Sequence, residues 1–224
     1  MIVGDLKPMD EIVAMIAGYR KILVLGCGSC VTVCLSGGER EARQLARELS
    51  HPMHYQGDPP EIRVGSILRQ CEQDLVSAYQ EVAPDIDAIL SLACGAGVQT
   101  LGDAFEPLPV LPALNTTFYG ASSKPGVWHE VCQGCGDCLL SHTGGICPIA
   151  RCAKSLLNGP CGGSQNGACE IDPNTPCAWM MIYHRLKKQN KLHLLDRLSL
   201  IRDWQSAGGA GPRVRIRTGI GDPQ

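Results

Sequence analysis

The sequence has no long hydrophobic run, no excess of charge of either sign and few aromatic residues. No apolar run approaches the ~18 residues that a membrane-spanning helix needs, so membrane insertion is not expected. The 20 Lys and Arg nearly balance the 22 Asp and Glu, which excludes a strongly basic nucleic-acid-binding protein. Acidic residues among the first fifteen positions make a poor secretory signal, so we expect a cytoplasmic protein.

Cysteine, in contrast, is abundant, with 13 in 224 residues. An odd number cannot pair completely in disulfides, and a chain without an export signal is expected in a reducing compartment. Cys132, Cys135 and Cys138 lie three residues apart, which suits three ligands of one metal centre better than disulfides between them. Thiolates are soft ligands that select iron–sulfur clusters, zinc or copper(I). The pattern therefore favours metal centres over disulfides and redox-active thiols.

Residues 1–120 alternate helical and strand signals, which predicts an α/β domain with a small Rossmann-like parallel sheet. Strands are expected at 22–25, at 67–68 with an end near Cys71, and at 88–92. A fourth, through 110–111, is expected at an edge because prolines flank it. Apolar stripes at helical spacing predict two helices, on Ile12, Met15, Ile16 and Tyr19 and on Ala42, Leu45, Ala46 and Leu49.

Five cysteines follow these strands. Cys27 and Cys30 come after the first strand, Cys71 closes the second and Cys94 follows the third. Because the carboxyl ends of parallel strands share one edge, four thiolates are expected to converge there. Cys34 lies one helical turn beyond Cys30, so five candidates compete for four places and either Cys34 or Cys71 is a spectator.

Other interpretations of this segment remain open. Cys27-x-x-Cys30 at a strand-to-helix turn also fits a thioredoxin-like dithiol, or the cysteines are inert and buried. Gly26-x-Gly28 lacks the third glycine of a dinucleotide-binding fingerprint.

Residues 121–224 predict a second, loop-rich domain with a C-terminal helical segment and a basic tail. Residues 128–178 show no sustained hydrophobic periodicity, so they are not expected to form a conventional core. Metal centres bound by cysteines are expected to stabilise this segment instead. Two sets of four cysteines predict two [4Fe–4S] clusters, and the alternative is a structural Cys₄ zinc site. The eight are Cys132, Cys135, Cys138, Cys147, Cys152, Cys161, Cys169 and Cys177.

Several residues near these cysteines also bear on the prediction. Cys147-Pro148 follows the cysteine triplet as in bacterial ferredoxins, although at a longer spacing. His129 and His142 flank the cysteine loops, where a surface or supporting role is favoured over metal ligation. Residues 178 to about 204 are expected to form one helix or two, with a break near Asn190, because their apolar stripes continue to Leu198 and Ile201. No catalytic triad or carboxylate pair stands out, so we expect no catalytic residues.

The cysteine motifs form a distinctive set. They include TGGICP at 143–148, CAKSLLNGPCGG at 152–163, GACE at 167–170 and CAW at 177–179. This pattern resembles the C-terminal domain associated with bacterial methylenetetrahydrofolate reductases. GCGSC at 26–30, GGE at 37–39 and CGAGVQ at 94–99 are similar to that family too, so the resemblance covers nearly the whole chain. In acetogens and related bacteria this unit is the small, cysteine-rich V subunit.

The resemblance implies a partner, the flavin-containing (β/α)₈ catalytic subunit that interconverts methylenetetrahydrofolate and methyltetrahydrofolate. Family members are described both as zinc-binding and as iron–sulfur proteins. We therefore expect a non-catalytic electron-transfer subunit with two or three [4Fe–4S] clusters, zinc replacing one of them as an alternative. Its electron donor would be a ferredoxin, an NAD(P)H-oxidising module or a disulfide-reductase-like subunit. Lys154 is a plausible tuner of cluster potential.

Two further hypotheses remain. The first is a zinc-stapled structural subunit of the same reductase. The second is an accessory protein in which a zinc-bound thiolate serves methyl transfer, which requires an open coordination position.

Overall fold

The computed structural model describes residues 1–55, 57–79, 85–199, 201–207 and 212–214. The chain forms two compact units, unit 1 (Met1–His129) and unit 2 (Glu130–Gln224). Each unit is described by itself below.

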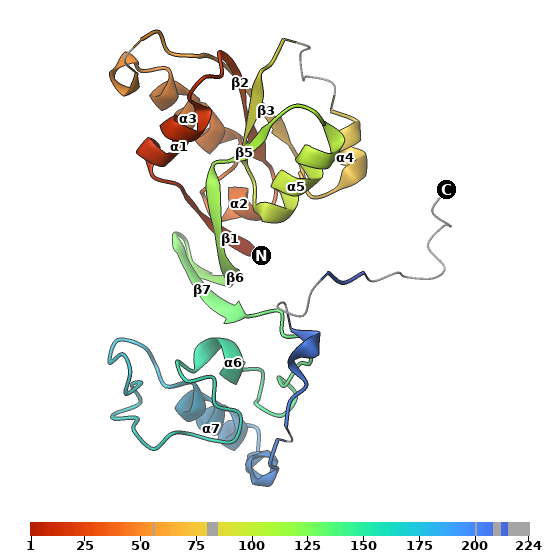
Figure 1. Cartoon of the computed structure of the whole chain (residues 1–224). Coiled ribbons are helices and arrows are strands. Elements are labelled where there is room, and N and C mark those ends of the chain that lie inside the picture. The colour runs from red at the N-terminus through yellow and green to blue at the C-terminus, as the bar shows by residue number, and fades with distance from the viewer. Residues whose placement is uncertain (56, 80–84, 200, 208–211, 215–224) are drawn as a thin grey trace. The chain divides into compact units, whose positions relative to one another are not determined.

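Unit 1 is built around a four-stranded parallel sheet in the order β3-β2-β4-β5 (Figure 1). Its strands are β2 (Lys21–Cys27), β3 (Glu61–Ile67), β4 (Ala88–Leu92) and β5 (Val110–Pro112). β2 lies in the middle, with Ile22 paired to Ile62 on one side and to Ala88 on the other. The α/β class, the strand at 88–92 and the edge strand at 110–111 are thereby confirmed.

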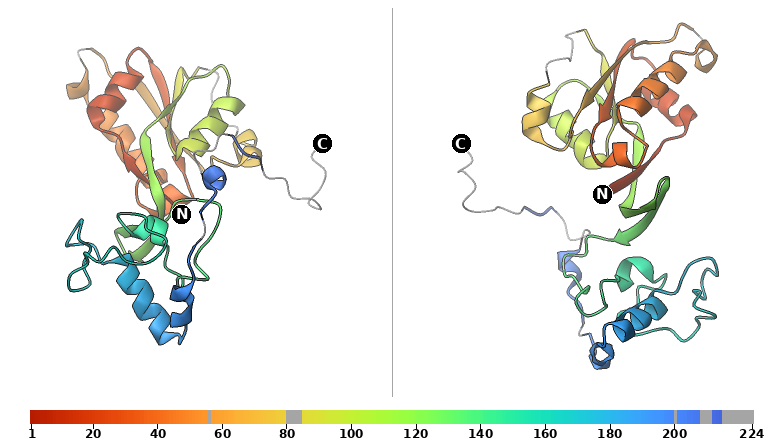
Figure 2. Two further views of the ribbon diagram at one scale, coloured as in Figure 1. Left: turned by 60° about the horizontal axis from the view of Figure 1, so that its bottom comes forward. Right: turned by 180° about the vertical axis from the view of Figure 1, so that it is seen from behind.

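Helices cover both faces of this sheet (Figure 2). Successive side chains of a strand point to opposite faces. Ile22 and Val24 pack into one cluster with residues of α1 (Met9–Ile16) and α3 (Glu39–Leu49). Leu23 and Leu25 pack into the other with α4 (Gln73–Ser77) and α5 (Gly95–Ala104). Because β2 is buried on both faces, it is a nearly continuous apolar run.

The two predicted helices of unit 1 are present. α3 buries the predicted stripe of Ala42, Leu45, Ala46 and Leu49. Its first turn is closed by the N–H of Gly38, which donates to the Glu41 carboxylate at 3.0 Å. α1 ends at Ile16, so Tyr19 lies beyond the helix on which it was predicted.

The second predicted strand was misplaced. β3 ends at Ile67, where the predicted strand begins, and starts six residues earlier at Glu61. β3 is an edge strand whose Glu61 and Arg63 are exposed or half-buried polar residues. Alternation of polar and apolar residues therefore hid it from a search for apolar runs.

Unit 1 also carries an antiparallel sheet that the sequence analysis did not predict. Its order is β1-β6-β7, with β1 (Ile2–Leu6), β6 (Leu114–Lys124) and β7 (Val127–Cys132). β6 is rich in Ser, Thr and Asn, and most of its side chains are exposed. The strand therefore lacks a hydrophobic signal, and it is held by its register with β1, in which Leu6 pairs with Leu114. β7 ends at Cys132.

Unit 2 has little regular structure. It contains α6 (Pro148–Arg151), α7 (Ala178–Lys188) and the 3₁₀ turns η2 (Leu192–Asp196) and η3 (Trp204–Ser206). Its core cluster has five buried members, which are Ile146, Cys177, Trp179, Ile182 and Leu186. The predicted break near Asn190 is confirmed, since that residue has a left-handed φ of 56°. A helix continuing to 201 was wrong: Leu198 and Ile201 are exposed.

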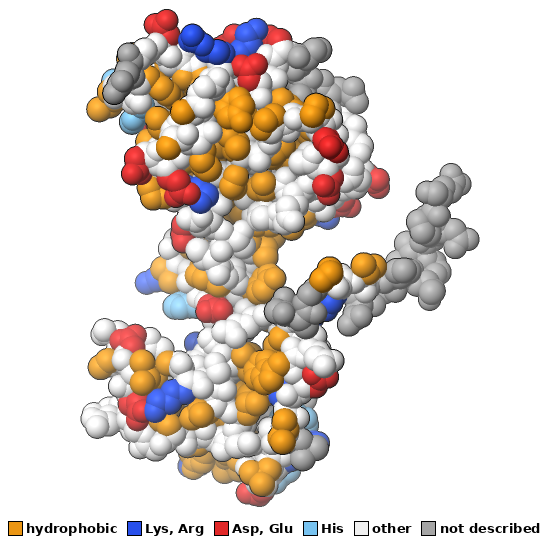
Figure 3. Space-filling view, in the orientation of Figure 1, with side chains coloured by type: hydrophobic (Ala, Val, Ile, Leu, Met, Phe, Trp, Pro, Cys, Tyr) orange, Lys and Arg blue, Asp and Glu red, His pale blue; other side chains and the backbone are white. Residues whose placement is uncertain are grey.

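Surface charges of both signs lie side by side at the top of unit 1 (Figure 3). The basic tail was predicted to run to the end of the chain, but residues 215–224 lie outside the described part. Within the described ranges, no helix combines the length and the apolar character needed to cross a membrane.

Candidate metal centres

No disulfide bond joins any of the thirteen cysteines, all of which lie in the described part of the chain. They fall into three sets. The triplet loop is Cys132–Cys138. The sheet-edge set lies after the strands of unit 1 and consists of Cys27, Cys30, Cys34, Cys71 and Cys94, and the C-terminal set consists of Cys147, Cys152, Cys161, Cys169 and Cys177. Among the described residues, no three His, Cys, Asp or Glu side chains converge closely enough to hold one metal ion.

The sheet-edge set lies at the carboxyl end of the parallel strands. β2 ends at Cys27, which is buried, and α5 begins directly after Cys94, which is half-buried. Cys71 is exposed in the turn after β3. The thiols of Cys71 and Cys94 both interact electrostatically with Cys27. The three thiols thus lie at one end of the sheet, but they do not converge closely enough to hold one metal ion, and Cys30 begins the four-residue helix α2 (Cys30–Val33).

The Cys27 thiol has a perturbed pKa. Burial raises the pKa above its ordinary value, and the nearby Cys71 and Cys94 raise it further. Backbone N–H groups of Gln70 and Ser29 act in the opposite direction, because they donate to the sulfur. The thiol is thus held in its neutral form, and a metal binding there would displace its proton. The two amides would then remain as donors to the thiolate.

Gln70 is a positioning residue that the sequence analysis missed. Its side chain is fully buried. Its amide nitrogen donates to the carbonyl of Leu25 at 3.0 Å, and its amide oxygen accepts from the Ser91 hydroxyl at 2.6 Å. One side chain thus ties the turn after β3 to β2 and β4, the strands that carry Cys27 and precede Cys94. Only its place beside Cys71 in the sequence could have indicated this.

Two glycines of the quoted motifs allow close packing at this edge. A Cβ at Gly97 would lie 2.8 Å from the Cβ of Ala93 and 3.0 Å from that of Gln70. A Cβ at Gly37 would lie 2.2 Å from the carbonyl oxygen of Leu92. The carbonyl of Gly37 also accepts the N–H of Cys27 at 2.8 Å. These glycines therefore serve the packing of the backbone around the thiols.

Cys34 has a different environment. It is buried, and its sulfur lies 3.0 Å from the Ser36 hydroxyl and 3.6 Å from the carbonyl of Val31. It lines a cavity of about 310 Å³, together with residues such as Trp128; no other member of the sheet-edge set is among the described lining residues. Cys34 thus has protein partners of its own.

The triplet loop is more open. Cys132 and Cys138 are exposed, and Cys135 is half-buried. Gly134 and Gly136 have φ values of 61° and 81°, a region that other residues adopt at a cost. The N–H of Gly134 donates to the Cys132 sulfur at 3.4 Å. The loop is therefore folded so that a backbone amide faces sulfur, as at sites where thiolates bind metals.

Arg202 is the second residue that the sequence analysis missed. Its Nη2 donates to the Cys135 sulfur at 3.0 Å and to the carbonyl oxygen of Asp137. Its Nη1 lies 3.4 Å from the Asp137 carboxylate. The Arg202 side chain is only 3% exposed, and its buried Nε has no hydrogen-bond partner among the residues that the structure describes. Since 67 residues separate it from Cys135, no spacing rule could have found it.

The C-terminal set surrounds the core of unit 2. Cys177 is buried at the N-cap of α7, where the helix dipole favours negative charge, and Cys152 packs on the same core cluster. Cys147 is the N-cap of α6. Cys169 is half-buried, and its N–H donates to Thr175, whereas Cys161 is exposed.

The other predicted site residues lie apart from sulfur contacts. The ring Nε2 of His129 is 3.0 Å from the Ser123 hydroxyl. Lys154 forms an ion pair with Glu170, so its charge is compensated by a carboxylate. His142 lines a cavity of about 980 Å³ in unit 2, together with Cys138 and Arg202.

The donor types of the triplet loop suit a thiolate-bound metal, although its three sulfurs do not converge closely enough to hold one ion in the described structure. The triplet loop offers three soft ligands, an amide directed at sulfur, and a buried guanidinium with one donor uncompensated. A cluster or tetrathiolate metal held by cysteines is anionic, so it would supply an acceptor for the Nε and negative charge in addition to that of Asp137.

Comparison with known proteins bears on the same region. Residues 111–205, just under half of the chain, match the family model described as "Methylene-tetrahydrofolate reductase C terminal". The matched range contains the triplet loop, the C-terminal set and Arg202. No curated protein and no solved structure shows a significant match. The resemblance seen in the sequence is thus confirmed for this part of the chain, whose residues 111–205 are similar to the C-terminal family of methylene-tetrahydrofolate reductase.

Proposed function

We propose that this protein is an iron–sulfur electron-transfer subunit of a methylenetetrahydrofolate reductase. The observation that carries the proposal is the triplet loop inside the family-matched region, where an amide and a buried guanidinium donate to cysteine sulfur. Donors of this kind adjust the reduction potential of an iron–sulfur cluster.

We assign two clusters to the eight cysteines of unit 2 and a third to the sheet-edge set. For the third, the mutual interaction of Cys71 and Cys94 with Cys27 supports these three with Cys30 as ligands. The protein partners of Cys34 support its role as the spectator. Bound clusters would supply one-electron transfer.

The chain's own residues bind, position and shield the centres. Gln70 fixes the edge of the sheet, Gly134 donates to sulfur, and Cys177 lies at a helix N-terminus. The proposed partner is a flavin-containing catalytic subunit, since a flavin can collect single electrons and transfer a hydride equivalent. The electron donor would be a ferredoxin, an NAD(P)H-oxidising module or a disulfide-reductase-like subunit, in the cytoplasm.

The test is the iron, zinc and acid-labile sulfide content of protein prepared without oxygen. Three [4Fe–4S] clusters would give about twelve irons per chain, and two would give about eight. Addition of the protein should then allow a flavin-containing reductase to accept electrons from a reduced donor. An iron-free protein that still supports folate reduction by its partner would contradict the proposal.

A second candidate is a zinc-stapled structural subunit of the same reductase. The small core of unit 2, with five buried residues in its cluster, favours it because such a unit needs a staple whatever the metal. Zinc as the sole metal, with no sulfide, would support this function instead.

A further inference from the structure

We propose that Arg202 raises the reduction potential of the cluster held by the triplet loop. The inference rests on the proposed function, because it concerns the centre to which Cys135 is assigned.

The guanidinium of Arg202 points at the triplet loop. A single Nη2 donates to the Cys135 sulfur at 3.0 Å and to the carbonyl of Asp137, two residues further along the loop. A hydrogen bond to a ligand sulfur stabilises the electron-rich state of a cluster. Arg202 makes such a charged contact with a cysteine of the triplet loop.

Arg202 places a buried positive charge beside the triplet loop. Arg202 is 3% exposed, so its positive charge is largely removed from water. The neighbouring Asp137 carboxylate is 3.4 Å away and 67% exposed, which leaves it well solvated and a weak counter-charge. A buried cation favours the addition of an electron to a centre that it contacts, because reduction makes that centre more negative.

The buried Nε of Arg202 has no hydrogen-bond acceptor in the described part of the chain. A buried N–H without an acceptor is unfavourable, and it is rare in folded proteins. A sulfide or thiolate of a cluster bound in the loop would supply an acceptor. Trp204 holds the guanidinium from another side, since the Cζ of Arg202 lies 5.2 Å from the centre of its ring.

The test compares Arg202→Met and Arg202→Lys with Arg197→Met in the oxygen-free full chain. Arg197 is an exposed arginine that lines the same cavity, so its variant loses the same charge from the same region. Iron content is measured first, and the midpoint potential of each centre is then followed by EPR during redox titration.

We expect normal iron in all three proteins. In Arg202→Met the one-electron reduction equilibrium of one centre should fall at least tenfold, which is 59 mV. In Arg202→Lys this equilibrium constant should fall by less, because lysine keeps the positive charge and loses only the planar guanidinium. In Arg197→Met it should change by less than threefold.

Normal iron with an unchanged midpoint in Arg202→Met would overturn this inference alone. If both Arg202 variants contain less iron while Arg197→Met is normal, Arg202 is needed for assembly and the statement about potential is wrong. A wild-type protein without iron would overturn the proposed function and this inference together.

Discussion

Two buried polar side chains, Gln70 and Arg202, connect parts of the chain that carry cysteines. Each makes hydrogen bonds across a long sequence separation, 45 residues from Gln70 to Leu25 and 67 from Arg202 to Cys135. The approach of Cys27, Cys71 and Cys94 could be predicted, because strand ends in a parallel sheet meet at one edge. The roles of Gln70 and Arg202 could not be predicted, because neither residue belongs to a motif or a period.

Replacement of Gln70 by leucine should destabilise unit 1. Leucine fills a similar volume but removes the hydrogen bonds that Gln70 makes with the Leu25 carbonyl and the Ser91 hydroxyl, a loss of about 1–3 kcal/mol in the free energy of unfolding. Urea unfolding followed by circular dichroism measures it. The control is Gln73→Leu, since Gln73 is exposed on α4. Equal midpoints for the two variants would show that the buried amide contributes nothing.

Serine substitutions should separate the ligands from the spectator. Cys94→Ser should lower the iron content by about four per chain, the iron of one [4Fe–4S] cluster. Cys34→Ser should retain all iron, because the Cys34 sulfur already makes hydrogen bonds with the Ser36 hydroxyl and the Val31 carbonyl. Iron and sulfide analysis of both variants provides the measurement. Loss of iron from Cys34→Ser with full iron in Cys94→Ser would reverse the assignment.

The strands differ in how clearly the sequence announces them. β2 and β4 are buried on both faces and form apolar runs, so they could be predicted. β3, β1 and β6 have exposed positions and polar residues, and their pairing depends on distant partners. The same holds for the end of α7, where the stripe of leucines continues into the 3₁₀ turn η2 instead of a helix. Period alone cannot distinguish these outcomes.

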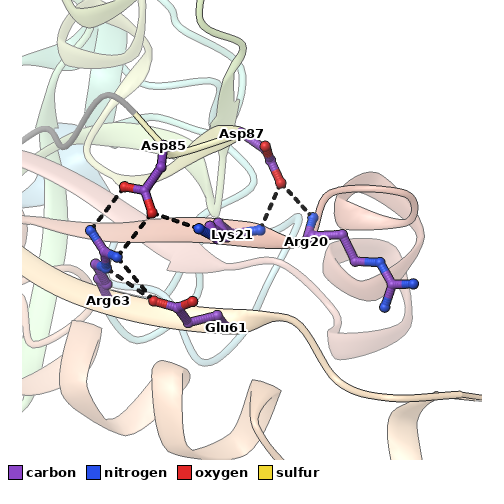
Figure 4. Close-up of polar contacts among 6 residues, drawn as sticks. All are labelled: Arg20, Lys21, Glu61, Arg63, Asp85 and Asp87. Atoms are coloured by element: carbon purple, nitrogen blue, oxygen red, sulfur yellow. Dashed lines mark hydrogen bonds and ion pairs between the residues drawn. The ribbon is translucent and has the colours of Figure 1, made fainter.

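An ion-pair network lies at the amino end of the parallel sheet, opposite the cysteines (Figure 4). The Lys21 ammonium is 2.6 Å from the Asp85 carboxylate, and Arg63 is 3.2 Å from it. One oxygen of Asp87 accepts the backbone N–H groups of Arg20 and Lys21, both at 2.8 Å. These contacts join the starts of β2, β3 and β4.

This network predicts a pH-dependent contribution to stability. The hydrogen bond from Lys21 lowers the pKa of Asp85 below its ordinary value of 3.8, and the charge of Arg63 acts in the same direction. A carboxyl with a depressed pKa stabilises the fold above that ordinary value, and the contribution is lost as pH falls through the depressed pKa.

Asp85→Asn should therefore unfold at a slightly lower urea concentration than the wild type at pH 7. The difference should shrink at pH values below the depressed pKa of Asp85, where the wild-type carboxyl is protonated too. Urea midpoints across this pH range provide the measurement, with Asp58→Asn, another exposed position, as control. A difference that stays constant with pH would exclude the ion pairs as its cause.

The two units differ in how they are held together. Unit 1 has two clusters of buried apolar residues, one on each face of its sheet. Among its described residues, unit 2 has one cluster of five buried residues, and seven of its eight cysteines lie outside helices and strands. A unit with so small a core depends on cross-links or metal for its stability.

Removal of metal should therefore unfold unit 2 and leave unit 1 folded. After chelation without oxygen, amide hydrogen exchange in α7 should accelerate by at least tenfold, while exchange in α3 should stay unchanged. Mass spectrometry of peptides from the two helices gives both values in one experiment. Unchanged protection of α7 would show that unit 2 is stable on its apolar core alone.

The contact between Arg202 and Cys135 also has a consequence for biosynthesis. A ribosome adds about 5–20 residues per second, so the arginine is made roughly 3–13 s after the cysteine that it contacts. During that interval the nascent loop exposes its thiols without their cationic partner. A chain stalled before residue 202 is therefore expected to present Cys135 to a metal without the hydrogen bond from the arginine.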